Sequence, residues 1–181
     1  LAGLPYMGVG RNLAYRKKLF MKAKGFISHY KVNSGDDDLF INKTAKKNNV
    51  QIEVSKDSHT ISEPKRSFSS WFLQKKRHFS TGKYYKKSDK LRLSLYSITQ
   101  FLFFAGVVVL PIIMGWHLFV IIALSLLVLR WSFLLLLYYY ACQKLNESKL
   151  FLYSPIFEII FLLLNPVFII SNLFYKTNKW K

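Results

Sequence analysis

The sequence predicts a soluble α/β fragment followed by transmembrane α-helices. The charge distribution is the first observation behind this prediction, because residues 1–93 carry 21 Lys and Arg against 7 Asp and Glu. Residues 94–181 carry only 6 basic and 2 acidic side chains. The second observation is that helix-like and strand-like patterns both occur in the first part, and the third is that long uncharged apolar runs fill the second.

The soluble part shows the patterns of three helices and a strand. Residues 11–24 place apolar side chains at helical spacing and end at Gly25, and residues 36–49 predict a helix whose first turn is acidic. Residues 50–54 alternate apolar and polar side chains, which predicts a half-buried strand. Residues 67–79 predict a helix that is both aromatic and basic, a type that often lies among lipid headgroups. One strand among helices indicates an α/β layer.

The second half of the chain reads as membrane helices. Residues 95–114 and 118–140 are each long enough to span a bilayer, and their short connection predicts a hairpin. A third apolar stretch, 150–174, either crosses the membrane or forms a re-entrant or interfacial segment. The expected organisation is a soluble domain at 1–92, a hairpin at 93–140, a polar loop at 141–149, the third apolar segment at 150–175 and a basic tail at 176–181.

Five basic residues lie immediately before the first span, in a chain whose net charge is +18. Basic residues close to a membrane helix favour the cytoplasmic side, and they also attract anionic headgroups. This topology accounts for the positive charge, so we expect the membrane, and no nucleic acid, as a partner. The lone Cys142 excludes an internal disulfide and fits a reducing compartment. The five basic residues immediately before the first span are Lys83, Lys86, Lys87, Lys90 and Arg92.

Three polar segments precede the apolar half in a fixed order. They are Gly-Val-Gly-Arg-Asn-Leu-Ala-Tyr-Arg at 8–16, Ser-Gly-Asp-Asp-Asp-Leu at 34–39, and Gln-x-x-Arg-His at 74–78. In this order, and with membrane helices behind them, the segments resemble the second half of a bacterial membrane-bound glycosyltransferase of family two. The resemblance covers essentially the whole chain, and it implies the acceptor half of an inverting GT-A type domain.

This resemblance implies that the aspartate block holds the catalytic base. In the family a carboxylate deprotonates the acceptor hydroxyl as that hydroxyl attacks the anomeric carbon of a nucleotide-diphosphate sugar. The family's second acid falls on Asp37, and Asp36 takes the place of its usual Glu. Asp38 leaves this register ambiguous by one residue. The alternative is that the three aspartates are merely exposed acids at a helix N-terminus.

The other candidate site residues come from the flanking segments. Family members place a Gln-x-x-Arg-Trp segment beside the active site, so Gln74 and Arg77 are expected to hold the diphosphate and the acceptor. His78 replaces the Trp, which favours transfer of one sugar over processive polymerisation. Candidates for the substrate cleft also include Trp71, Asn12 and Tyr15. For the segment with Gln74, Arg77 and His78, the alternative is a basic helix that touches lipid headgroups. For Asn12 and Tyr15, the alternatives are ordinary loop and helix-cap roles.

The family's donor half would supply what this chain lacks. The sequence contains no Asp-x-Asp outside residues 36–38 and no zinc-ligand spacing, so the Mg²⁺ or Mn²⁺ that the family implies would be bound by a missing N-terminal part. We therefore expect a bacterial inner-membrane, multi-pass hexosyltransferase-like enzyme that does not turn over as this chain alone. Its partners would be a nucleotide-sugar donor and a lipid-linked or glycan acceptor. The competing interpretations are a processive polysaccharide synthase and a non-catalytic polybasic membrane adaptor.

Overall fold

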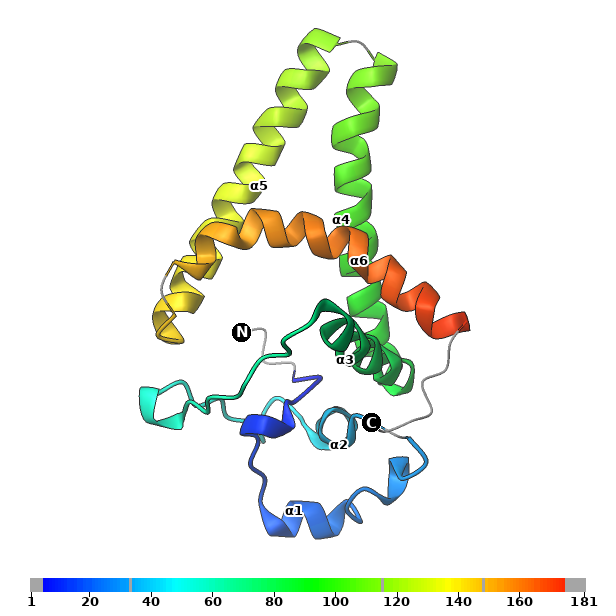
Figure 1. The fold of residues 1–181 in the computed structure, drawn as a ribbon, viewed down its shortest axis with the longest axis vertical. Helices are drawn as coiled ribbons and strands as arrows, with labels where there is room; N and C mark the ends of the chain where they lie inside the picture. The colour runs from blue at the N-terminus through cyan, green and yellow to red at the C-terminus, as the bar shows by residue number, and fades with distance from the viewer. Residues whose placement is uncertain (1–4, 33, 115, 148, 175–181) are drawn as a thin grey trace. The chain divides into compact units, whose positions relative to one another are not determined.

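The computed structural model describes residues 5–32, 34–114, 116–147 and 149–174, and these residues are all helical or irregular (Figure 1). No strand occurs within them, so the prediction of an α/β fragment is wrong. The α-helices are α1 (Lys17–Lys22), α2 (Asp36–Thr44), α3 (Phe68–Thr81), α4 (Lys87–Met114), α5 (Trp116–Lys144) and α6 (Ser154–Phe174). The short 3-10 helices are η1 (Gly10–Asn12), η2 (Ile27–His29), η3 (Lys56–Ser58), η4 (Gly82–Tyr84) and η5 (Leu150–Tyr153).

The predicted strand at residues 50–54 is irregular backbone. Its three apolar side chains, Val50, Ile52 and Val54, are 40%, 58% and 39% exposed, so the alternation does not bury one face. A strand is stable only beside a partner that completes its backbone hydrogen bonds. The described part of the chain contains no other strand to provide that ladder.

The first predicted helix is also shorter than its pattern. Residues 11–24 contain only the end of η1 and the six residues of α1, because the backbone at Leu13 and at Arg16 is extended. The polar side chains of Arg11 and Asn12 bond to the segment that contains Ser58 and Ser62. These long-range contacts hold the chain in an extended path where local spacing alone favours a helix.

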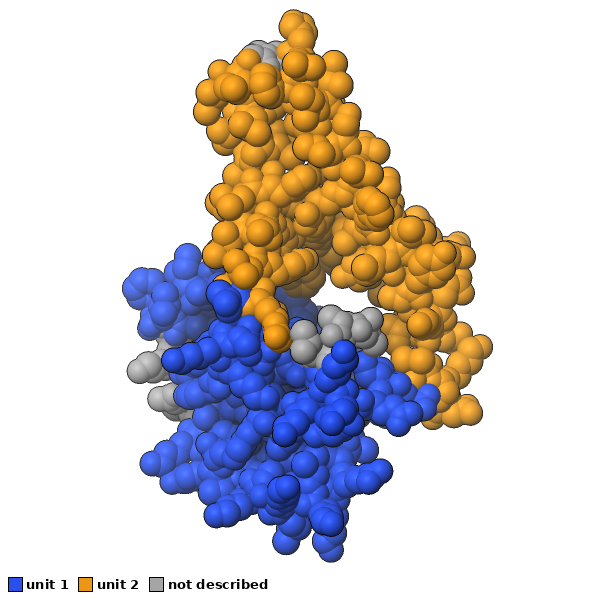
Figure 2. All heavy atoms as spheres, turned by 180° about the vertical axis from the view of Figure 1, so that it is seen from behind, with its two compact units in different colours: residues 1–53, 58–91, 166–181 blue, residues 54–57, 92–165 orange. Residues whose placement is uncertain are grey.

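The chain forms two compact units, which are coloured separately in Figure 2. Unit 1 comprises residues 1–53, 58–91 and 166–181, and unit 2 comprises residues 54–57 and 92–165. The soluble, basic part of the sequence therefore falls in unit 1, together with the C-terminal half of α6.

Helix α2 forms the centre of unit 1. Its N-cap, Gly35, has a φ of +80°, and a Cβ there would lie 2.3 Å from Cγ2 of Thr81, so glycine satisfies both the backbone and the packing. Phe40 on this helix is 1% exposed and packs against the rings of Tyr15, Phe20 and Phe26. This aromatic cluster fixes α2 and thereby the three aspartates of its first turn.

Helix α3 begins at a Ser67 cap, whose side chain accepts a hydrogen bond from the backbone of Ser70. One of its faces packs on the fully buried Phe168 of α6 through the rings of Phe72 and Phe79. The side-chain amide of Asn172 also donates to the backbone carbonyl of Lys76 at 2.9 Å. The C-terminal half of α6 is thus bound to α3 by both apolar and polar contacts.

Three helices are long and apolar enough to cross a membrane: Lys87–Met114, His117–Lys144 and Leu150–Phe174. Their apolar side chains are largely exposed; Ile113, for example, is 71% exposed. A soluble protein rarely leaves so much apolar surface uncovered, whereas lipid-facing helices do so routinely. The chain is therefore a membrane protein, as its composition predicts.

Arg130 of α5 connects the three helices of unit 2. Its guanidinium donates twice to Oε1 of Glu158 on α6, with the Nε–Oε1 distance at 2.9 Å. The same guanidinium lies over the rings of Phe103 and Phe104 on α4, at 4.7 and 5.5 Å from their centroids. A charge within a membrane helix is costly unless it is paired, and this arrangement supplies both an ion pair and cation–π contacts.

Candidate functional site

The carboxylate of Asp37 is oriented by two backbone N–H groups from different parts of unit 1. Gly10 donates to Oδ2 at 2.5 Å across 27 residues of sequence, and the neighbouring Asp38 N–H donates to Oδ1 at 2.9 Å. A carboxylate has about four acceptor positions, so two of them remain for other hydrogen bonds. The side chain is half-buried, which leaves it accessible to an incoming hydroxyl.

Two glycines allow the loop before α1 to approach α2 this closely. A Cβ at Gly10 would lie 2.9 Å from Oδ2 of Asp37, and a Cβ at Gly8 would lie 2.7 Å from Cγ1 of Ile41. Both distances are below those of real contacts, so any side chain would push the loop away. The glycine spacing in the first segment therefore serves the contact with Asp37.

The three adjacent aspartates occupy different environments. Asp36 is exposed, Asp37 is half-buried and Asp38 is only 3% exposed. Burial, followed by the charge of Asp37, raises the pKa of Asp38 to about 6, although hydrogen bonds from the Tyr85 side chain and the Gly8 backbone oppose the rise. Burial likewise raises the pKa of Tyr85 to about 12. Asp38 is thus part of the core and is bonded to Gly8, whereas Asp37 is the partly exposed aspartate that accepts from Gly10 of the same loop.

His78 lies within electrostatic range of both Asp37 and Arg11. Loss of hydration, then the positive charges of Lys75 and Arg77, lowers the pKa of His78, whereas the charge of Asp37 raises it and that of Arg11 lowers it. The ring nevertheless retains an exposed surface. The structure therefore brings together groups from three segments that the sequence separates: the glycine loop, the start of α2 and the last turn of α3.

Helix α3 presents different residues on its two faces. Because an α-helix turns once in about 3.6 residues, Gln74 and His78 share one face, and Arg77 lies beside Gln74. Phe72 and Phe79 occupy the opposite side, against Phe168. Gln74 and Arg77 are both half-buried.

Trp71 differs from the other candidates on α3, because its ring packs against other aromatic rings. It lies 5.6 Å from the ring of Phe68 and 6.0 Å from the ring of Phe168. These contacts give Trp71 a packing role in the structure. Its predicted contact with substrate remains a prediction.

Asn12 and Tyr15 also have partners inside unit 1. The Asn12 amide donates to the backbone carbonyl of Ser58 at 2.9 Å, and the Tyr15 ring stacks on Phe20 at 5.4 Å and contacts Phe40. Tyr15 remains 40% exposed, so part of its surface faces solvent. Asn12 therefore fixes the loop, and Tyr15 covers the aromatic cluster beneath α2.

The structure places two further residues, Arg11 and Tyr85, beside the aspartates and α3. The Oγ of Ser62 accepts a hydrogen bond from the Arg11 guanidinium at 2.6 Å. The backbone carbonyl of Arg11 accepts one from the Thr60 hydroxyl at 3.2 Å. Tyr85 contacts Asp38 from beyond the end of α3. The position of Arg11 directly after Gly10 is a sequence signal for the place of Arg11. No local pattern in the sequence indicates the contact between Tyr85 and Asp38.

Among the described residues, no group of three or more His, Cys, Asp or Glu side chains gathers to hold a metal ion. The Mg²⁺ or Mn²⁺ that the family resemblance implies therefore has no complete set of ligands among these described residues. Comparison of the chain with family models, with curated proteins and with solved structures found no match.

Proposed function

We propose that this chain carries the catalytic base and acceptor side of an inverting glycosyltransferase at a membrane surface. The observation that carries the proposal is the Asp37 carboxylate, which the Gly10 N–H orients while Arg11 and His78 lie nearby. The order of the three polar segments ahead of membrane helices supports the same assignment. The nucleotide-sugar donor would be bound mainly by residues beyond this chain.

In the proposed reaction Asp37 removes the proton of an acceptor hydroxyl. The hydroxyl oxygen then forms a bond to the anomeric carbon of the donor sugar, and the bond from that carbon to the diphosphate oxygen breaks. The nucleoside diphosphate leaves with the bonding electron pair, and the single in-line displacement inverts the anomeric configuration. The two backbone hydrogen bonds hold the carboxylate in one orientation, which reduces the cost of positioning the base.

The leaving diphosphate develops negative charge that nearby cations would stabilise. Arg77 is assigned this role because a guanidinium forms two parallel hydrogen bonds to phosphate oxygens. Arg11 precedes Asp37 in the sequence, whereas α3 follows it. Arg11 adds a second positive charge near His78. Gln74 would position the acceptor, and His78 would line its binding site.

The three helices long and apolar enough to cross a membrane support a reaction at a bilayer surface. The basic residues next to the start of α4 favour the cytoplasmic face by the positive-inside rule, so we assign the reaction to the cytoplasmic side of a bacterial inner membrane. A lipid-linked or membrane-associated glycan acceptor fits that position. His78, which offers a smaller stacking surface than the Trp of the family, favours single transfer over processive synthesis.

The test is a transfer assay on membranes from cells that express the complete gene product. Extracted lipids and glycans are incubated with a panel of radiolabelled nucleotide sugars, and transfer of label is measured for the wild type, Asp37→Asn and Asp36→Asn. We expect Asp37→Asn to lower turnover by about 10²–10⁴-fold, the usual contribution of a general base, and Asp36→Asn to have a much smaller effect.

Membrane insertion serves as the control, because both variants are expected to insert at wild-type levels. Near-wild-type turnover of Asp37→Asn would refute the assignment of the base. A complete gene product that transfers no sugar from any donor, yet keeps its biological activity in the Asp37→Asn form, would instead support a non-catalytic membrane adaptor.

A further inference from the structure

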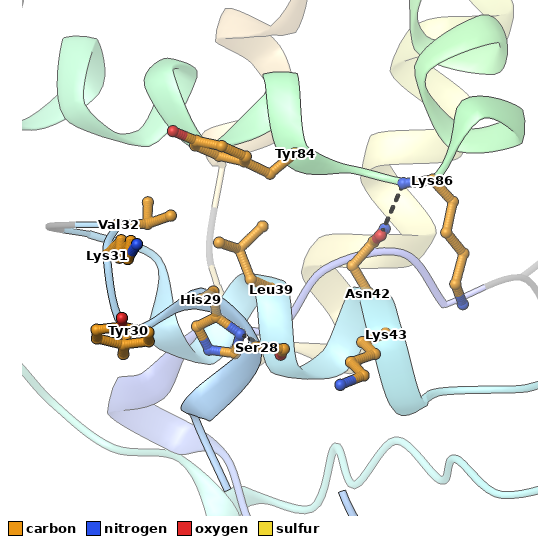
Figure 3. A pocket seen from close by; sticks show the side chains of 10 residues that line it. All are labelled: Ser28, His29, Tyr30, Lys31, Val32, Leu39, Asn42, Lys43, Tyr84 and Lys86. Atoms are coloured by element: carbon orange, nitrogen blue, oxygen red, sulfur yellow. Dashed lines mark hydrogen bonds between the residues drawn. The ribbon is translucent and has the colours of Figure 1, made fainter. Parts of the chain in front are cut away.

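Unit 1 contains a pocket of about 500 Å³ beside α2 (Figure 3). Its walls come from residues 28–32, from α2 through Leu39, Asn42 and Lys43, and from the segment before α4 through Tyr84 and Lys86. At about 3.6 residues per turn, Asp37 and Ile41 share one face of α2, whereas Leu39, Asn42 and Lys43 lie on the other. The pocket is therefore separate from the proposed active site and does not depend on it.

Positive charge dominates the lining of this pocket. Lys31, Lys43 and Lys86 contribute three ammonium groups, and no Asp or Glu side chain is part of the wall. Within the described residues none of the three lysines forms an ion pair with a carboxylate. Lys31 instead lies 5.7 Å from the centroid of the Tyr30 ring. The charges are thus available to an anion that enters the pocket.

A buried histidine adds a polar atom that has no partner. His29 is only 9% exposed, its Nδ1 lies 3.0 Å from the Ser28 hydroxyl, and its Nε2 is buried without a hydrogen bond. Burial is the main cause that lowers the pKa of His29, with Lys43 acting in the same direction and the backbone and carboxylate of Asp36 acting against it. The ring is therefore neutral at pH 7. If its Nδ1 accepts from Ser28, its Nε2 carries a proton that an anion can accept.

The pocket wall is tied directly to the first turn of a membrane helix. The backbone N–H of Lys86 donates to Oδ1 of Asn42 at 2.9 Å, and the Asn42 amide donates to the buried Asp89 of α4 at 3.0 Å. Helix α4 begins at Lys87 and is apolar enough to cross a membrane. The pocket wall is thus hydrogen-bonded to the first turn of a candidate membrane span.

We propose that this pocket binds a phosphate-bearing anion, from either a phospholipid headgroup or a soluble phosphate compound. Three lysines that have no carboxylate partners supply charge, and the buried imidazole of His29 adds a polar group to the same wall. Phosphate oxygens are strong acceptors that suit both kinds of donor. The size of the pocket accommodates a headgroup as readily as a small phosphate ester.

The experiment follows the four histidines of the whole chain by NMR in a neutral detergent, with the His29 signal assigned from a His29→Gln variant. Short-chain phosphatidylglycerol and inorganic phosphate are titrated separately. Either ligand is expected to shift the His29 signal saturably and to raise its pKa, because a bound anion stabilises the imidazolium. A response to the lipid alone identifies a headgroup, and an equal response to phosphate identifies a soluble ligand.

Charge-matched variants distinguish the pocket from general attraction to a basic protein. Lys43→Gln/Lys86→Gln removes two charges from the wall, whereas Lys22→Gln/Lys47→Gln removes two exposed charges elsewhere in unit 1. We expect the first variant to weaken binding at least tenfold, and the second to keep it within about threefold. Absence of a saturable His29 response to both ligands, or equal binding by the two variants, would overturn the proposal.

Discussion

At the scale of single residues, Asp38 makes the stability of unit 1 depend on pH. Its folded-state pKa of about 6 lies above the ordinary 3.8, so the folded state binds the proton more tightly than the unfolded state does. The resulting stability is fully present below about pH 4 and is lost as pH rises through 6. Because one pKa unit corresponds to about 1.4 kcal/mol, the loss is at most about 3 kcal/mol.

Hydrogen exchange of the α2 backbone amides between pH 4 and 7, corrected for intrinsic rates, measures this effect. We expect α2 to lose protection across that interval in the wild type, and Asp38→Asn to remove most of the loss because an amide cannot ionise. The exposed Asp36→Asn variant controls for general acid titration. The same pH dependence in Asp38→Asn and the wild type would contradict the prediction.

The sequence predicted where the helix that carries the three aspartates begins, but it did not predict which distant residues contact them. Ser34 and Gly35 correctly mark the start of α2, because a glycine with positive φ and an acidic first turn are local signals. The contact between Gly10 and Asp37 spans 27 residues and was not predictable from spacing. The same is true of Tyr85, whose contact with Asp38 depends on how α3 returns to α2.

At the scale of secondary-structure elements, Arg130 and Glu158 stabilise the attachment of α6 to α5. The Glu158 side chain is 5% exposed and the Arg130 side chain 28%, so removal of either partner leaves a largely buried charge. Such a loss costs about 3–5 kcal/mol, whereas replacement of both charges by apolar groups is often nearly neutral. We therefore expect Glu158→Gln to destabilise unit 2 strongly and Arg130→Met/Glu158→Met to restore most of the loss.

Thermal unfolding in detergent, followed by tryptophan fluorescence, tests this pair because Trp131 adjoins Arg130. Lys144→Gln, an exposed residue at the end of α5, provides a charge-loss control that should unfold like the wild type. If Glu158→Gln unfolds at the wild-type temperature, the pair does not hold α6.

Elements were predictable where their signal is local, and not where it depends on partners. The apolar runs predicted α4 and α5, and the helix predicted at residues 67–79 begins within one residue of α3. The alternation of apolar and polar residues at 50–54 led to a wrong prediction of a strand, because strand formation requires a neighbouring strand. The helical spacing of residues 11–24 misled because Arg11 and Asn12 form contacts with residues 58–62.

At the scale of the whole molecule, the contacts of α6 bear on whether it crosses the membrane. Two crossings by α4 and α5 return the chain to the side on which α4 began. The C-terminal half of α6 then packs on α3, since Phe168 contacts Phe72 and Phe79, and Asn172 donates to Lys76. Helix α3 precedes the first crossing. Both ends of α6 would thus lie on one side, and we predict that α6 lies along the interface and does not span the bilayer.

Labelling of single cysteines in intact spheroplasts tests this topology. In a Cys142→Ala background, cysteine is introduced at Lys179 in the tail, at Lys47 in unit 1 or at His117 between the first two spans, and each variant is exposed to a membrane-impermeant maleimide. We expect labelling at position 117 alone, because an interfacial α6 keeps the tail with unit 1 and agrees with the positive-inside rule for its lysines. Labelling at position 179 without labelling at 47 would show that α6 crosses the membrane, and the contacts between α6 and α3 would then require both helices to lie within it.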